Sequence, residues 1–177
     1  MLMRKINAVI SLLTTVFLLD HAIFSSVWMF SGGAVEQSAP IAPWVLAGLV
    51  ATHAFISIYF GVSSHMEGEQ RKVRSYPKMN RVTMFQRISG ILLIIFTVLH
   101  IGGVTGGMKQ PYVVHLFLTP LFFAVALAHA AVSTDKALIT LGIGNARAIR
   151  IIGIVMRVIC AVTLIAALAG FVSYSWR

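Results

Sequence analysis

Long apolar stretches separated by short polar connections dominate this chain of 177 residues. A helix rises about 1.5 Å per residue, so about 20 apolar residues are needed to cross the hydrocarbon core of a bilayer. Stretches of this length recur along the whole sequence. The pattern predicts an all-α integral membrane protein, a single domain over 1–177 whose transmembrane helices form a bundle and cover about residues 7–30, 41–65, 82–104, 112–133 and 150–174.

Basic residues gather at one end of the predicted helices. Most Lys and Arg lie before the first stretch and in the connections that follow the second and fourth stretches. Cytoplasmic connections of membrane proteins carry an excess of Lys and Arg, so this pattern predicts a cytoplasmic N-terminus and an outer C-terminus. The first stretch is too long for the apolar region of a signal peptide, and we interpret it as an uncleaved helix. We therefore expect a multi-pass protein of the inner or plasma membrane.

Composition excludes several other classes. Hydrophobic residues make up 58% and charged residues 11% of the chain, whereas a soluble domain carries roughly 25% charged residues. We attribute the net charge of +9 to the membrane topology and to a surface for anionic lipid or a protein partner. We expect no nucleic-acid partner. A single cysteine excludes a disulfide framework and a thiolate cluster.

Histidines supply the candidate chemistry. Ionisable side chains are costly inside a bilayer and are candidates for function, and two neutral imidazoles from facing helices can hold a haem iron. An isolated histidine could instead hydrogen-bond to a neighbouring helix. Four of the six histidines lie within predicted helices and two near helix ends, in the order His21, His53, His65, His100, His115 and His129.

A weak internal repeat groups the four intramembrane histidines in pairs. The first and third stretches place a phenylalanine four residues before the histidine, in FLLDH and FTVLH, so that both rings share one helix face. The second and fourth stretches flank the histidine with alanines, in ATHAF and LAHAA, which leaves room for a flat macrocycle. The repeat favours pairing of His21 with His100 and of His53 with His129.

Depth in the membrane tests these pairs. At 1.5 Å per residue, His21 and His100 lie about 21 and 27 Å above the inner boundary, close enough in level to share one haem. His129 lies about 6 Å above that boundary, His65 about 0 Å and His53 about 18 Å. Depth therefore slightly favours His65 as the partner of His129, whereas the repeat favours His53. We keep His53 as the predicted ligand and His65 as the alternative.

Four segments carry a resemblance to a known family: FLLDHAIF, THAFISI, MFQRISGILLIIFTVLH and TPLFFAVALAHAAV. They resemble the five-helix, single-subunit, di-haem cytochrome b membrane anchor of succinate dehydrogenases and fumarate reductases. The resemblance implies axial ligands at His21 and His100 for a distal haem b, and at His53 and His129 for a proximal one. One departure is Leu127, where some di-haem fumarate reductases carry a glutamate on a proposed proton path.

The resemblance also implies partners and an activity. It implies an iron–sulfur subunit and an FAD flavoprotein subunit on the cytoplasmic side, with electrons passing between them and a quinone, expected to be menaquinone. The chain would then be a subunit of an enzyme complex without itself converting succinate or fumarate. Two other functions stay open, namely the haem b subunit of a membrane hydrogenase or formate dehydrogenase, and a transporter without haem.

Four further residues are candidates for the site. Asp20, an acid deep in the first stretch, could exchange protons with quinol, or accept a hydrogen bond from a neighbour. Ser89 lies about three turns before a predicted ligand, with Gln86 one turn further inward, so both could contact the inner haem, or Ser89 could serve helix packing. Arg157 could pair with a haem propionate or extend its side chain to the headgroups.

Overall fold

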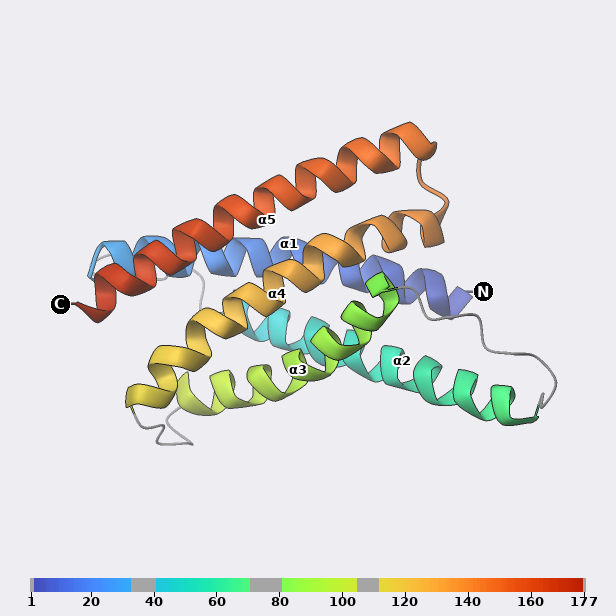
Figure 1. Ribbon diagram of the computed structural model, residues 1–177, viewed down its shortest axis with the longest axis horizontal. Helices are drawn as coiled ribbons and strands as arrows, with labels where there is room; N and C mark the ends of the chain where they lie inside the picture. The colour runs from blue at the N-terminus through green and yellow to red at the C-terminus, as the bar shows by residue number, and fades with distance from the viewer. Residues whose placement is uncertain (1, 33–40, 71–80, 105–111, 177) are drawn as a thin grey trace.

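The computed structural model describes residues 2–32, 41–70, 81–104 and 112–176, without the side chains of 64–70, 104 and 112–116. This part of the chain is all helical, and each helix is long and apolar enough to cross a membrane. The predicted all-α, five-helix, multi-pass architecture is therefore confirmed over the described residues. The helices are α1 (Leu2–Phe30), α2 (Ala42–Gln70), α3 (Arg81–Val104), α4 (Tyr112–Leu141) and α5 (Ala146–Ser175) (Figure 1).

The helices continue past the apolar stretches that predict them, most clearly at the end of α4. This helix runs to Leu141 instead of about residue 133, because its last polar turns still favour helix. Gly142 and Gly144 then adopt φ of 72° and 78°, a conformation that favours glycine and turns the chain. Asn145 starts α5, since its side chain accepts a hydrogen bond of 2.9 Å from the Ala148 N–H.

Three helices form the packed part of the bundle. α1, α4 and α5 contact one another, while α2 packs mainly on α1 and α3 mainly on α4 (Figure 1). One cluster of buried side chains joins the three central helices, and a second joins α4 and α5. One is built from Met29, Phe123, Ala167 and Phe171, and the other from Leu127, Ala130, Ala131 and Cys160.

Small residues allow the central helices to approach closely. Ala167 is fully buried, and a Cβ added at Gly170 would lie 3.1 Å from the Ser26 carbonyl oxygen. Without water to drive association, membrane helices depend on this kind of close backbone packing. The contact between α1 and α5 is therefore set by small side chains.

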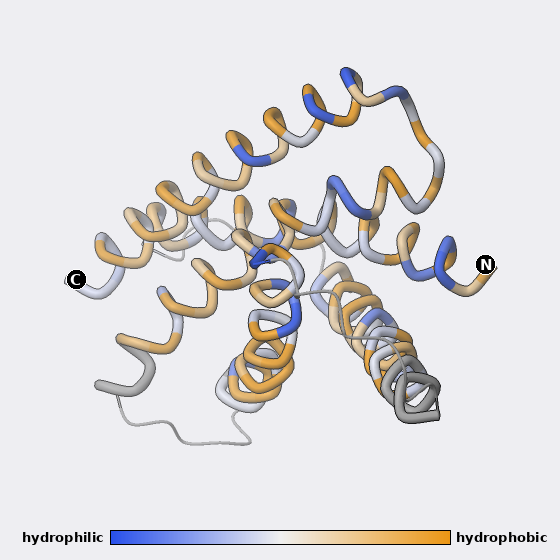
Figure 2. The backbone as a smooth tube through the Cα atoms, turned by 45° about the vertical axis from the view of Figure 1, so that its right-hand side comes forward, coloured by the Kyte–Doolittle hydropathy of each residue, from blue (hydrophilic) through white to orange (hydrophobic). Residues whose placement is uncertain are grey.

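The opposite side of the bundle is open. Only 6% of the most apolar stretch is buried in α2 and in α3, against 33% in α4. Hydrophobic residues run along every helix, and the hydrophilic residues of α1, α4 and α5 gather toward the end of the bundle that holds the N-terminus (Figure 2). The fold thus leaves most of the surface of α2 and α3 outside the packed part of the bundle.

Candidate functional site: a histidine-lined cavity

A cavity of about 1940 Å³ fills the space inside the bundle. Ordinary ligand pockets measure about 300–1,000 Å³, so this one has room for more than one large ligand. Side chains from all five helices line it, and most of the lining is apolar. The four intramembrane histidines are among the lining residues: His21, His53, His100 and His129.

His129 has a defined hydrogen-bond partner behind its ring. Its Nδ1 lies 2.8 Å from Ser89 Oγ, and Ser89 is only 3% exposed. The single Ser89 hydroxyl proton is directed to the Phe85 carbonyl oxygen at 2.7 Å, so the hydroxyl oxygen accepts from His129 Nδ1–H. This tautomer leaves the lone pair of His129 Nε2 free to bind a ligand.

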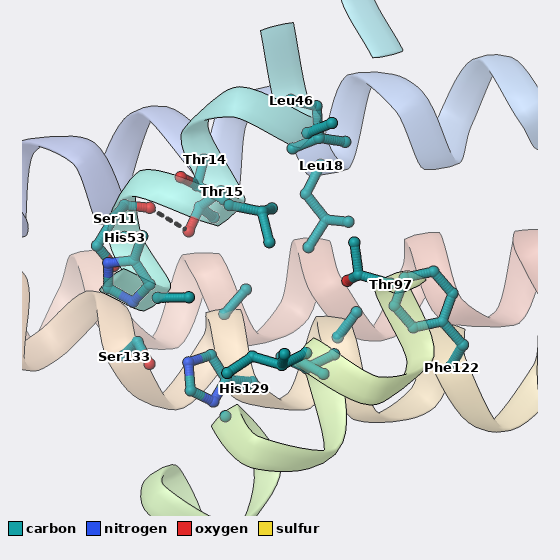
Figure 3. A pocket seen from close by; sticks show the side chains of 18 of the residues that line it. Ser11, Thr14, Thr15, Leu18, Leu46, His53, Thr97, Phe122, His129 and Ser133 are labelled. Atoms are coloured by element: carbon teal, nitrogen blue, oxygen red, sulfur yellow. Dashed lines mark hydrogen bonds between the residues drawn. The ribbon is translucent and has the colours of Figure 1, made fainter. Parts of the chain in front are cut away.

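His53 reaches the same part of the cavity from α2. Figure 3 shows the side chains of His53, Ser133 and His129 in the same region of the pocket. His53 Nδ1 is buried and has no hydrogen-bond partner among the described residues. We call these two histidines the inner pair.

His21 and His100 meet across the cavity from α1 and α3. Their ring centroids lie 6.3 Å apart, with 79° between the ring planes. If two imidazoles held one metal ion between them, with metal–nitrogen bonds of about 2.0 Å, their ring centroids would lie about 6 Å apart. Phe122 borders this site, with its centroid 5.2 Å from that of His100. We call His21 and His100 the outer pair.

The donor set suits a metal that brings most of its own ligands. Over the described residues, no group of three or more His, Cys, Asp or Glu side chains is placed to hold a metal ion. Each histidine pair supplies two nitrogen donors, which is the number of axial ligands that an iron in a macrocycle requires. The described histidines can therefore supply nitrogen donors to a metal that brings its remaining ligands.

One end of the cavity is basic. Lys136 Nζ donates to Thr83 Oγ1 at 3.0 Å and also to Gln86 Oε1, and Gln86 Nε2 donates to Ser133 Oγ at 3.3 Å. No Asp or Glu is found among the lining residues that the structure describes. We name this part the cationic end, after Arg4, Arg87 and Lys136. Uncompensated cations of this kind favour an anionic group on whatever ligand fills the cavity.

Aromatic side chains border the other end. Trp28 and Tyr174 have ring centroids 5.3 Å apart, and Trp44 is a further lining residue. Trp and Tyr concentrate where a membrane protein meets the membrane–water interface. The cavity therefore spans the bundle from a basic to an aromatic end.

The predicted site residues fall in different places. Gln86 lies at the cationic end, and Ser89 lies behind His129 without lining the cavity. Asp20 is exposed on the outer surface of α1, and Arg157 forms an ion pair of 3.3 Å with Asp135. Neither Asp20 nor Arg157 lines the cavity. The side chains of two histidines lie outside the described part of the chain, namely His65 and His115.

The sequence does not predict several of the polar lining residues, and two of them are Lys136 and Asn7. Lys136 belongs to the basic connection that follows the fourth predicted stretch, and the sequence indicates no site at Asn7. Both stand near helix ends, where polar residues are common and carry no distinctive spacing. Only the packing of the helices shows that they reach the cavity.

Comparison with protein-family models, with curated proteins and with solved structures finds no match to this chain.

Proposed function

We propose that this chain is the di-haem membrane anchor and electron-transfer subunit of a succinate:quinone oxidoreductase, either a succinate dehydrogenase or a fumarate reductase. One observation carries the proposal: four histidines from four helices line one cavity, and His21 and His100 face each other with ring centroids 6.3 Å apart. The resemblance of the sequence to such anchors supports the choice among haem proteins. A further supporting feature is that α2 and α3, which are largely unburied, contribute lining residues to this cavity.

The charges support an orientation. Arg4, Arg87 and Lys136 support a cytoplasmic position for the cationic end, because positive residues favour that side of a membrane. Carboxylates of an inner haem would be held there by charge-assisted hydrogen bonds from Lys136 and the two arginines. The iron–sulfur subunit and its FAD flavoprotein would dock against this side, and the inner pair would be the nearer site.

The protein's own residues position and insulate the site. When bound, haem b supplies one-electron transfer between a quinone and the iron–sulfur subunit. Ser89 fixes the His129 tautomer and the direction of its ring, which tunes the ligand. Leu127 and Phe123 are buried in α4 and keep water from the central part of the bundle. Trp28 and Trp44 border the aromatic end, where the flat head of a quinone can approach the outer pair.

The experiment is the reduced-minus-oxidised spectrum of the purified chain and of single variants. We expect b-type absorption in the wild type, loss of one haem in His129→Ala and loss of the other in His21→Ala. Trp176→Ala is a matched control, because Trp176 is 87% exposed and lies outside the cavity. We expect it to keep both haems.

The outcomes separate the other functions. If the wild type has no haem signal, the electron-transfer proposal fails, and a transporter or structural role becomes the better explanation. If the haems are present but the complex contains a hydrogenase or molybdenum subunit instead of a flavoprotein, the alternative anchor is correct. A spectrum unchanged by His53→Ala but altered by His65→Ala would show that His65, and not His53, is the inner ligand beside His129.

A further inference from the structure

The cavity reaches the outer surface of the bundle along α2 and α3. It is open to the outside, and these two helices do not form an extensive contact with each other over the described residues. Ile58 of α2 and Ile91 of α3 both line the cavity, yet they are 54% and 63% exposed. A residue that lines a cavity and is mostly exposed marks the place where the cavity meets the surface.

The positions around each helix agree with this opening. Successive residues of a helix turn by about 100°. On α3, Ser89 contacts α4 through His129, and Ile91 lies about 200° further around the helix, so it points away from α4. On α2, Ser57 accepts a hydrogen bond from α1, and Ile58 lies about 100° around from it.

Four exposed lining residues define the opening, which we call the mouth: Ile58 and Gly61 on α2, and Arg87 and Ile91 on α3. The mouth is apolar except for Arg87. Because both helices are long and apolar enough to cross a membrane, the mouth faces lipid.

Arg87 is the cation of the cavity that has no partner. Lys136 uses two of its three N–H donors on acceptors of α3, and the Arg4 guanidinium lies 5.8 Å from the centre of the Phe60 ring. Arg87 makes no hydrogen bond or ion pair with another residue that the structure describes. A charge at membrane depth is costly without an opposite charge, so Arg87 needs an anion from outside the chain.

We propose that the mouth is a binding site for one anionic phospholipid, whose phosphate lies on Arg87 and whose acyl chain lies along Ile58 and Ile91. A guanidinium binds phosphate through two parallel hydrogen bonds, and basic pockets between transmembrane helices bind anionic lipid headgroups. Arg87 lies about 9 Å along α3 from its start, and Ile91 about 6 Å deeper. The cation thus precedes the apolar part of the mouth, in the order of a headgroup and its chain.

This lipid site goes beyond the proposed function and does not depend on haem. The five N–H donors of Arg87 suffice for a phosphate at the mouth and for a carboxylate inside the cavity. A lipid chain across Ile58 and Ile91 would separate the cavity from the rest of the bilayer.

The first test counts bound lipid by native mass spectrometry of the full-length chain, produced in a haem-deficient host. The chain is titrated with phosphatidylglycerol and with phosphatidylcholine, whose phosphate is neutralised by its own choline. We expect saturation at one phosphatidylglycerol per chain, bound at least about five-fold more tightly than phosphatidylcholine, because a cation near an anionic lipid contributes roughly this factor.

Arg87→Gln should abolish this preference. Arg81→Gln is the matched control, because Arg81 is an exposed arginine on the same helix that does not line the cavity. It should bind phosphatidylglycerol as the wild type does. Excess inorganic phosphate should not displace the lipid, since the chain contributes to binding.

The second test blocks the mouth without changing its charge. A Cβ added at Gly61 or at Gly48 of α2 would meet no atom within 4 Å, but only Gly61 lines the cavity. Gly61→Phe should therefore lose the bound phosphatidylglycerol, whereas Gly48→Phe should keep it. The thermal unfolding midpoint of each variant reports whether it is folded.

The outcomes are distinct. Arg87→Gln that binds phosphatidylglycerol like Arg81→Gln overturns the inference, as does a wild type without preference between the two lipids. Displacement by inorganic phosphate would show a site for a free anion and would also overturn it. A chain that binds the lipid through Arg87 but takes up no haem refutes the proposed function alone, and a chain with two haems and no lipid preference refutes the lipid site alone.

Discussion

The Ser89–His129 contact gives the sharpest test of how the site is built. Ser89→Ala removes the oxygen that accepts from His129 Nδ1 at 2.8 Å, in a position that is 3% exposed. The Nδ1–H left without a partner costs about 1–3 kcal/mol. Loss of the partner behind a metal ligand weakens metal binding roughly 10–100-fold, or about 1.4–2.8 kcal/mol. The two estimates agree, so we expect the inner haem to be released roughly 10–100-fold more readily.

The assay measures transfer of haem from the purified protein to a scavenging apoprotein, together with the thermal unfolding midpoint. Ser26→Ala is a closely matched control, because Ser26 is also 3% exposed and its hydroxyl donates to the Ala22 carbonyl oxygen at 2.6 Å, four residues before it. Ser89 makes the same kind of bond within its own helix. The histidine contact is therefore the main side-chain difference between the two positions.

Rescue completes the test. Ser89→Thr keeps a hydroxyl at the same position and should restore most of the haem affinity, while the outer haem should be retained equally by all three variants. If Ser89→Ala holds its inner haem as tightly as Ser26→Ala does, then Ser89 does not support His129 and the reasoning is refuted.

Three further predictions concern stability and the cationic end. Gly170→Ala places a methyl group 3.1 Å from an α1 carbonyl oxygen, so the free energy of unfolding should fall by about 1–3 kcal/mol. Gly48 has open space beside it, so Gly48→Ala should be neutral or stabilise the protein by up to about 1 kcal/mol. The same thermal assay measures both variants. Arg157→Gln breaks an ion pair whose side chains are 47% and 31% exposed, so it should change the unfolding free energy by about 1 kcal/mol or less. Lys136→Gln should weaken haem retention through loss of a cation at the cavity, while Arg150→Gln, exposed and outside the cavity, should not.

Hydropathy alone predicts most of the fold. Uninterrupted apolar stretches identify all five helices, because the bilayer demands that length and apolarity. Hydropathy does not predict where α4 ends. The turn after α4 depends on the left-handed conformations of Gly142 and Gly144 and on the Asn145 cap. These are local hydrogen-bond and backbone effects to which a hydropathy pattern is insensitive.

The site is harder to predict than the fold. Depth and the internal repeat suggest which histidines share a level, and the structure brings His21 close to His100. The contact of Ser89 with His129 depends on which faces of α3 and α4 meet, and helical spacing within one helix does not determine that. The ion pair of Arg157 with Asp135 is equally hard to predict, because it depends on the register between α4 and α5.

The number of haems per chain tests the central claim most directly. Quantification of extracted haem b against protein concentration in the purified chain, with the low-spin signature of two-histidine ligation, reports both histidine pairs at once. We expect two haems b per chain, each low-spin and six-coordinate. A chain that folds, is loaded in a haem-sufficient host, and still contains no haem would contradict the account.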